Sequence, residues 1–325
     1  MRALKKVSIV ILTAIIFMIL SGCSNYFDQG KLQKAGMLVE TSIHDQPWGK
    51  KGYQGLLEIE EEFNVDVFFK EGIQTEQEVN EAVDELVNQG VNLIFGHSST
   101  YGKHFKDIST AYPDVHFVYF NGGQFDEDLT SLNFNSHAMG FFGGMIAARM
   151  TETDNVGVVG AFEWQPEIEG FYEGAKYQNQ EVEVHLSYVN NWNESQLALE
   201  KYEHMQNKNV DVFYPTGDMF SASIIKHASE DDLYAIGYVS DQSEIAENTV
   251  LTSTIQHVEK LYVLTAEKFN EGELRGGVLT FDFKDDVISL GKYSPDVPEE
   301  FKDKMKEAVE EYKETGLLPN EQESD

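Results

Sequence analysis

The chain repeats one arrangement along most of its length: a short apolar run, a polar loop and an amphipathic stretch. Its first copy, residues 35–57, begins with Met37, Leu38 and Val39, which are typical of a buried strand. A polar loop at 41–48 leads into an expected helix whose apolar side chains fall near one face: Trp48, Tyr53, Leu56, Leu57 and Phe63. Strand, loop and helix in this order form the first unit of a doubly wound α/β domain, where ligands bind beyond the carboxyl ends of the strands.

The unit recurs as far as residue 270. Further strands are expected at 65–69, 91–95, 116–120, 155–160, 182–189, 210–214, 233–238 and 250–252, and a strand pair around 279–283 and 287–290. Helices are expected up to 111 and at 77–89, 137–150, 167–177, 195–207, 221–228, 258–270 and 299–315, with Asn193 or Ser195 capping the one at 195. Two sets of about five βα units predict two doubly wound, Rossmann-like lobes with a ligand cleft between them. The helix 137–150 is the expected crossing, and its Gly140, Gly143 and Gly144 permit close backbone packing.

The first 22 residues are typical of an export signal rather than of the fold. Arg2, Lys5 and Lys6 precede an apolar run at 7–20, which is short for a membrane span. The run ends in Leu20-Ser21-Gly22-Cys23, which resembles the bacterial lipobox and uses the only cysteine of the chain. We expect a signal peptide at 1–22, a lipid anchor on Cys23 and a polar tether at 23–34, on the outer face of the membrane of a Gram-positive bacterium. An uncleaved N-terminal anchor is the alternative.

The charge of the chain excludes several kinds of partner. Loss of the three basic residues of the signal takes the formal net charge from −32 to −35. Nucleic-acid binding relies on Lys and Arg side chains that neutralise phosphates, so no direct nucleic-acid partner is expected. For the same reason, contact with an anionic membrane is expected only through the lipid. With 41% hydrophobic residues, the chain can build a core, and the 303 residues after the signal suit two domains.

Polar and aromatic side chains follow the expected strands, and all three tryptophans of the chain lie in such loops. Because the carboxyl ends of parallel strands meet at one edge of a sheet, we expect these side chains to line a pocket. Their aromatic faces, carboxylates and amides suit a flat, polar or cationic small molecule. The candidates are His44, Asp45, Trp48, His97, Ser98, Tyr101, Asn121, Trp164, Gln165, Trp192, Asp218 and Asp241. The alternative for each is a loop side chain that packs on its own lobe.

The sequence gives little support to catalysis. Residues 96–100 lack the second glycine of a Gly-x-Ser-x-Gly nucleophile elbow, and the nine histidines form no metal-binding pair of the His-x-x-x-His type. The cysteine is assigned to the lipid, and no Gly-x-Gly-x-x-Gly sequence follows the first strand. We therefore predict a protein that is not an enzyme, with no catalytic residue, metal or cofactor.

Several segments together resemble the BMP (basic membrane protein) lipoprotein family, the purine-nucleoside-receptor type of class I periplasmic-binding-protein fold. They are residues 45–48, the Tyr-Pro-Asp turn at 112–114, the helix at 139–150, the segment 156–176 and the segment 235–260. The resemblance covers nearly all of the mature chain and looks particularly close to a surface lipoprotein described as a positive regulator of competence. It implies an N-terminal lobe of 35–136 plus about 253–282, a C-terminal lobe of 137–252 plus about 283–318, and a tail at 319–325.

The resemblance also implies a site, from which this sequence departs. In nucleoside-binding members an aromatic residue of the first loop stacks on the base, and Trp48 stands there. The family's neighbouring Asn, its ribose-binding Asp and a Lys are replaced here by Gly49, Val239 and Gln256. Each ribose hydroxyl left unpaired in a closed cleft would cost about 1–3 kcal/mol. The cleft is therefore expected to differ from an ordinary nucleoside site.

Two functions follow from this sequence. The first is a solute-binding receptor that delivers a small molecule, such as a nucleoside-like one, to an ABC permease. The second is a regulatory lipoprotein that promotes competence through protein partners and has an altered cleft. The aromatic loop residues favour the first, and the replacements at Val239 and Gln256 favour the second.

Overall fold

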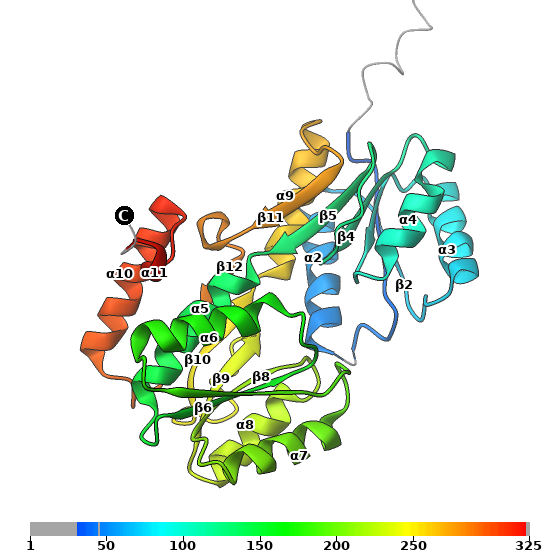
Figure 1. Cartoon of the computed structure of the whole chain (residues 1–325). Coiled ribbons are helices and arrows are strands. Elements are labelled where there is room, and N and C mark those ends of the chain that lie inside the picture. The colour runs from blue at the N-terminus through cyan, green and yellow to red at the C-terminus, as the bar shows by residue number, and fades with distance from the viewer. Residues whose placement is uncertain (1–30, 45, 323–325) are drawn as a thin grey trace, which may run out of the picture.

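The computed structural model describes residues 31–44 and 46–322, which form two α/β lobes, each built on a six-stranded sheet (Figure 1). The strand orders are β11-β5-β4-β3-β1-β2 and β12-β10-β9-β8-β6-β7, so corresponding strands follow the same order in both sheets. All strand pairs are parallel except β10 with β12. The predicted fold class, two doubly wound lobes, is confirmed.

The first lobe contains the strands β1 (Ala35–Leu38), β2 (Val67–Lys70), β3 (Leu93–Gly96), β4 (His116–Phe120), β5 (Leu129–Phe134) and β11 (Gly277–Phe281). Its helices are α2 (Pro47–Phe63), α3 (Glu76–Asn88), α4 (Tyr101–Ile108) and α9 (Val258–Asn270), with the short 3-10 helix η1 (Ser109–Ala111). Helices α3 and α4 pack on one face of the sheet, and α2 and α9 pack together on the other (Figure 1). The inner strands are buried on both faces, which explains their continuous apolar sequences.

The second lobe contains β6 (Asn155–Gly160), β7 (Glu183–Tyr188), β8 (Val212–Thr216), β9 (Tyr234–Val239), β10 (Val250–Gln256) and β12 (Ile288–Leu290). Its helices are α5 (Ser136–Met150), α6 (Pro166–Gln178), α7 (Ser195–Gln206) and α8 (Ser221–Glu230), followed later in the chain by η2 (Phe283–Asp285), α10 (Glu299–Thr315) and α11 (Pro319–Gln322). Helices α7 and α8 pack on one face of the sheet and α5 on the other. Among the described residues, none of the helices combines the length and apolar character needed to cross a membrane.

Helices α5 and α6 cross in close contact because four glycines leave no side chain between them. A Cβ on Gly140 or Gly144 of α5 would lie 2.0 or 2.1 Å from a carbonyl oxygen of α6. A Cβ on Gly170 or Gly174 of α6 would lie 2.0 or 1.9 Å from a carbonyl oxygen of α5. The close packing expected at 140 and 144 is confirmed. Gly143 differs, because its nearest neighbours are side chains of the second sheet at 3.6 Å or more.

Between residues 46 and 322 the chain passes from one sheet to the other three times: between β5 and α5, between β10 and α9, and between β11 and η2. The second crossing had been expected near residue 253. That position lies inside β10, which pairs with β9 and β12 of the second sheet. We therefore propose lobes of 31–135 with 257–281 and of 136–256 with 282–322.

Three local expectations were wrong. Leu57, expected on the apolar face of α2, is 40% exposed, whereas Leu56 of that face is buried as expected, together with Ile59. The two late strands do not pair with each other, since β11 extends the first sheet and β12 the second. The N-cap of α7 is Glu194, and no side chain accepts a hydrogen bond from the first turn of this helix.

The two ends of the chain are only partly described. Residues 319–322 of the expected tail form α11, in which Pro319 is buried. The signal peptide, Cys23 and the tether as far as residue 30 lie outside the described residues, as do residues 323–325. The last tether residues approach the first lobe, where the backbone N–H of Leu32 donates to Asn270 Oδ1 at 3.2 Å.

Candidate ligand-binding cleft

A cavity of about 600 Å³ lies between the lobes, at the carboxyl ends of the strands of both sheets. Pockets for small organic ligands have volumes of roughly 300–1,000 Å³, so a nucleoside-sized molecule fits. The first lobe contributes the loops after β1, β3 and β4, and the second contributes those after β6, β7 and β8 and the end of β9. Gln256, at the crossing from β10 to α9, also lines the cavity. This is the position at which doubly wound folds bind ligands.

Trp48 is held in the cavity wall by His97. The two rings stack with centroids 4.9 Å apart, and the Trp48 indole N–H donates to the His97 carbonyl at 3.2 Å. His97 Nε2 lies 2.8 Å from the Trp48 carbonyl, and Nδ1 lies 2.9 Å from the hydroxyl of Tyr262 on α9. Burial lowers the pKa of His97 to about 4, so the ring is neutral, with Nε2–H as donor and Nδ1 as acceptor. The first loop and the third strand are thereby locked together.

A buried polar cluster forms the floor of the cavity on the second lobe. Gln165 Nε2 donates to Glu167 Oε1 at 2.8 Å and to the Thr216 carbonyl at 3.0 Å, while its Oε1 accepts from the Phe162 backbone N–H at 2.8 Å. The Tyr238 hydroxyl also donates to Glu167 Oε1, at 2.9 Å. Burial raises the pKa of Glu167. The cluster fixes the loop after β6 in place.

Asp218 connects the lobes across the cavity. Its Oδ2 accepts from the backbone N–H of Trp48, in the first turn of α2, at 3.5 Å. The N-cap residue of α2, Gln46, makes no side-chain cap, so this carboxylate of the other lobe occupies the capping position. Oδ1 of Asp218 is buried and has no hydrogen-bond partner. Burial raises the pKa of Asp218 to about 6. Beside this contact, Gln46 Nε2 donates to Asn193 Oδ1 at 2.9 Å.

Three aromatic rings pack together on the second lobe, and two of them, Trp164 and Trp192, line the cavity. Phe162 and Trp164 stack at 5.4 Å, and Trp192 packs edge-on against both. Trp164 remains 62% exposed although it lines the cavity. An exposed indole at a pocket mouth leaves a flat apolar face available to a ligand.

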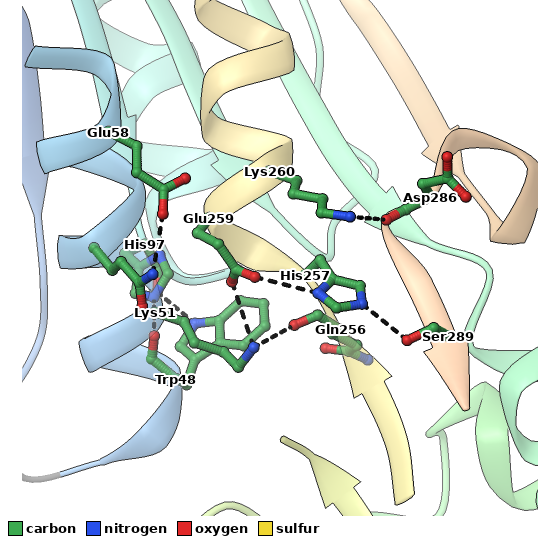
Figure 2. Close-up of polar contacts among 11 residues, drawn as sticks. Trp48, Lys51, Glu58, His97, Gln256, His257, Glu259, Lys260, Asp286 and Ser289 are labelled. Atoms are coloured by element: carbon green, nitrogen blue, oxygen red, sulfur yellow. Dashed lines mark hydrogen bonds and ion pairs between the residues drawn. The ribbon is translucent and has the colours of Figure 1, made fainter. Parts of the chain in front are cut away.

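A polar network lies beside the cavity at the crossing from β10 to α9, which we call the hinge (Figure 2). Lys51 of α2 donates to the carbonyl of Gln256 at 3.0 Å and pairs with Glu259 of α9 at 3.4 Å. His257, between β10 and α9, lies 3.2 Å from Glu259 and 2.8 Å from Ser289 of β12. The network ties α2 and α9 of the first lobe to β12, an edge strand of the second.

The structure brings eight of the twelve candidate residues to the cavity: Trp48, His97, Ser98, Asn121, Trp164, Gln165, Trp192 and Asp218. Their role in binding remains a prediction. Tyr101 is instead a core residue, because its ring is 1% exposed and its hydroxyl donates to the Ile73 carbonyl at 2.7 Å. Asp241 lies outside the cavity lining and accepts from the backbone N–H groups of Lys292 and Ser243, both at 3.0 Å. His44 is exposed away from the lining, and Asp45 lies outside the described residues.

The sequence analysis missed several cavity residues. The most informative are Glu167 and Tyr238, which form the floor, and Glu40 and Asn193 near the rim. Glu167 follows Gln165 and Pro166 directly, so its place at the start of α6 could have indicated it. A glutamate in the first turn of a helix ordinarily faces solvent, however, and favours the helix dipole there. Tyr238 sits inside a strand, where it cannot be distinguished from a core tyrosine.

Val239 lines the cavity in an unusual backbone conformation. Its φ angle is +64°, in the left-handed region that β-branched residues rarely adopt. Such strain persists only where the surroundings impose it, and it concentrates at binding sites. Val239 also stands where nucleoside-binding relatives are expected to carry an aspartate.

Comparison with known proteins places the chain in a family. Residues 32–322 match the Bmp family, described as ABC transporter substrate-binding protein PnrA-like. The transcriptional activator protein med of Bacillus subtilis (strain 168) is 44% identical over 304 residues, which span 94% of this chain and 96% of med. A crystal structure of a transcriptional activator of the comK gene from Bacillus halodurans is 47% identical, with a TM-score of 0.84, and covers 88% of this chain and 99% of its own.

A more distant structure supports the fold alone. The ABC transporter system solute-binding protein of Aeropyrum pernix K1 has a TM-score of 0.70 at 19% identity, over 88% of this chain and 81% of its own. The match to the family extends over nearly the whole described fold, including every loop that lines the cavity. The chain therefore belongs to the Bmp family of PnrA-like ABC transporter substrate-binding proteins.

Proposed function

We propose that the chain is a lipid-anchored solute receptor on the outer face of the cell membrane, which delivers a small polar organic molecule to an ABC permease. The observation that carries this proposal is the cavity of about 600 Å³ lined by loops of both lobes. A ligand that contacts both lobes binds their closed arrangement better than the open one, so it shifts the population toward closure. Closure presents a new surface to a membrane partner.

The lipid anchor on Cys23 is part of the proposal. It rests on the sequence at 20–23, since these residues lie outside the described fold. In a Gram-positive host, Cys23→Ser is expected to remove the acyl modification seen by mass spectrometry of the N-terminal peptide. If the wild-type protein is bound to the membrane but its N-terminal peptide has the mass expected without acyl groups, the lipid anchor is contradicted.

Ligand-dependent stability tests the receptor function. The chain from Ser24 onward retains the whole described fold, and its thermal unfolding would be measured against nucleosides, bases, amines and sugars. A ligand that binds only the folded state stabilises it by about 2.7 kcal/mol at a hundred times its dissociation constant. We expect one chemical class to raise the Tm by several degrees. No shift with any class at millimolar concentration would contradict a receptor for these solutes.

The matched variants are two exposed aromatic residues. Trp164 is 62% exposed and lines the cavity, whereas Phe125 is 55% exposed and lies outside the lining. Neither ring is buried in the core, so Trp164→Ala and Phe125→Ala should both fold. Trp164→Ala should weaken the ligand-induced shift, and Phe125→Ala should leave it unchanged. Equal effects of the two substitutions on the ligand-induced shift would show that the ligand does not contact Trp164.

A regulatory function is the second candidate, favoured by the 44% identity to a protein named a transcriptional activator. Because the sequence predicts an export signal and has a net charge of −32, we expect such activity to act through protein contacts rather than through DNA. Gly123 separates the two functions. It lines the cavity, and a Cβ there meets no atom within 4 Å, so Gly123→Trp can fill the space without displacing the wall.

The test uses Bacillus subtilis in which this chain replaces med, with comK transcription as the readout. A regulator that acts through its surface should support transcription equally with wild type, Gly123→Trp and the small control Gly123→Ala. If the chain acts only when a ligand fills the cavity, Gly123→Trp should lose comK transcription, whereas wild type and Gly123→Ala should keep it. No transcription with any of the three would count against the regulatory function.

A further inference from the structure

The charged side chains that line the cavity are all acidic. Among the described residues they are Glu40, Glu167 and Asp218, and no lysine or arginine belongs to the lining. His97 supplies no positive charge, because its ring is neutral and both nitrogens are engaged by Trp48 and Tyr262. The nearest hinge lysine, Lys51, is engaged by Glu259 and the Gln256 carbonyl. The cavity therefore holds negative charge without a protein counter-ion.

The three carboxylates differ in the hydrogen bonds that they accept. Glu40 accepts from the Thr100 hydroxyl. Glu167 accepts from Gln165 and Tyr238, at 2.8 and 2.9 Å. Asp218 has only the 3.5 Å contact from Trp48 to Oδ2, and its buried Oδ1 has no partner. A buried carboxylate is stable only when paired and hydrogen-bonded, so Asp218 is the group that a ligand would complete.

The walls around Asp218 suit an organic cation. Trp164 and Trp192 present indole rings at the second-lobe side of the cavity, and Trp48 lies on the first-lobe side. Aromatic faces attract ammonium and guanidinium groups in addition to stacking on flat apolar bodies. The strongly negative chain also raises the local concentration of cations at such a cleft.

We propose that the cleft takes a small organic cation, with a flat or aromatic body against the tryptophans and a protonated amine on Asp218 Oδ1. This inference rests on the proposed binding function and names its ligand class. The amine N–H groups donate to Oδ1, while Oδ2 keeps its contact with the first turn of α2. The ligand thereby completes a carboxylate that already bridges the lobes, so binding and closure act through the same side chain.

Matched probes that differ only in charge test the proposal. One set is tryptamine, neutral N-acetyltryptamine and anionic indole-3-propionate; the other is the 5′-amino derivative of adenosine, adenosine itself and its 5′-carboxylate. Binding to the full chain, held in nanodiscs of zwitterionic phosphatidylcholine, would be measured by calorimetry at pH 7.5. Since a hydrogen bond between two charged groups is stronger than one between neutral groups, we expect the cation of at least one set to bind at least about tenfold more tightly than its neutral partner.

Three variants locate the effect. Asp218→Asn should abolish the preference for the cation, and Asp218→Glu should retain a preference because it keeps the charge. Glu163→Gln is the control, since Glu163 is an exposed carboxylate of the loop after β6 outside the cavity lining. It should leave the preference unchanged. Thermal unfolding of each variant without ligand shows whether it is folded, and the neutral probe shows whether its cavity is intact.

The outcomes separate this inference from the proposed function. If the preference for the cation is lost in Asp218→Asn but kept in the other variants, both the inference and the receptor function are supported. Binding of a neutral or anionic probe as tightly as the cation overturns the inference and leaves the receptor function standing. Cation preference lost equally in Glu163→Gln also overturns it, because the effect would then be one of overall charge. Absence of binding by every probe counts against both and leaves the regulatory function.

Discussion

Gly52 shows how one missing side chain positions the cavity. A Cβ at this position of α2 would lie 2.4 Å from His97 Cε1, and His97 is held on both sides by Trp48 and Tyr262. Gly52→Ala should therefore lower the free energy of unfolding by about 1–3 kcal/mol through overpacking, although alanine favours the helix. Gly49→Ala in the same helix is the control, because its nearest atom is 3.4 Å away. Urea unfolding checks both, and equal stability would contradict the tight contact.

His97 predicts a pH dependence of stability. Its pKa falls from 6.5 to about 4 on burial, so the folded state disfavours the protonated ring. The stabilising contribution is complete above pH 6.5 and is lost as the pH falls toward 4, by on the order of 3 kcal/mol in total. Unfolding of wild type and of His97→Gln would be compared between pH 4 and 7.5. The stability difference should shrink toward low pH, and parallel curves would contradict it.

Most of the candidate residues lie at the cavity because strand ends are visible in the sequence, but the sequence does not show which way a side chain turns. Tyr101 begins α4 directly after a cavity loop, yet its ring points into the core between that helix and the sheet. Asp241 follows β9, yet one of its partners, Lys292, comes from the segment after β12, 51 residues further along the chain. Glu167 enters the cavity only because the α5–α6 crossing and Tyr238 orient it.

The crossing of α5 and α6 depends on its glycines. Gly174→Ala would place a Cβ 1.9 Å from the Phe141 carbonyl oxygen, so the two backbones must separate. We expect a loss of about 3 kcal/mol in the free energy of unfolding. Gly143→Ala is the control, because it lies in the same crossing helix but meets only side-chain atoms, at 3.6 Å or more. Chemical denaturation measures both, and an unaffected Gly174→Ala would contradict the close approach.

At the scale of elements, the sequence predicts well where turns and helix ends are marked. The limits of β4, β6, α9 and α10 agree with expectation to the residue. β10 was expected to end at residue 252 but continues to Gln256, because Thr252, Ser253 and Thr254 are buried. Their hydroxyls are satisfied by partners such as the Gly291 and Gly237 carbonyls. Polar residues in an inner strand cannot be recognised before those partners are known.

Two inter-lobe contacts beside the cavity, Gln46 with Asn193 and Trp48 with Asp218, should hold the ligand-free molecule partly closed. Asn193→Ala with Asp218→Ala should widen the distance between spin labels placed by Glu81→Cys on α3 and Glu200→Cys on α7. The chain from Ser24 has no native cysteine, so labelling is specific. Glu163→Ala with Glu194→Ala is the control pair. Identical distance distributions for all three proteins would show that these contacts do not restrain the lobes.

The interlaced path of the chain decides when each lobe can be finished during synthesis. Its first sheet needs β11, which ends at Phe281, whereas five strands of the second sheet are complete by Gln256. Five of the six strands of the second sheet therefore leave the ribosome before the last strand of the first sheet does. Until then β5 has an unpaired edge, on which an incomplete chain could associate with another. The second sheet in turn needs β12, which ends at Leu290, so each lobe is completed only after part of the other has been synthesised.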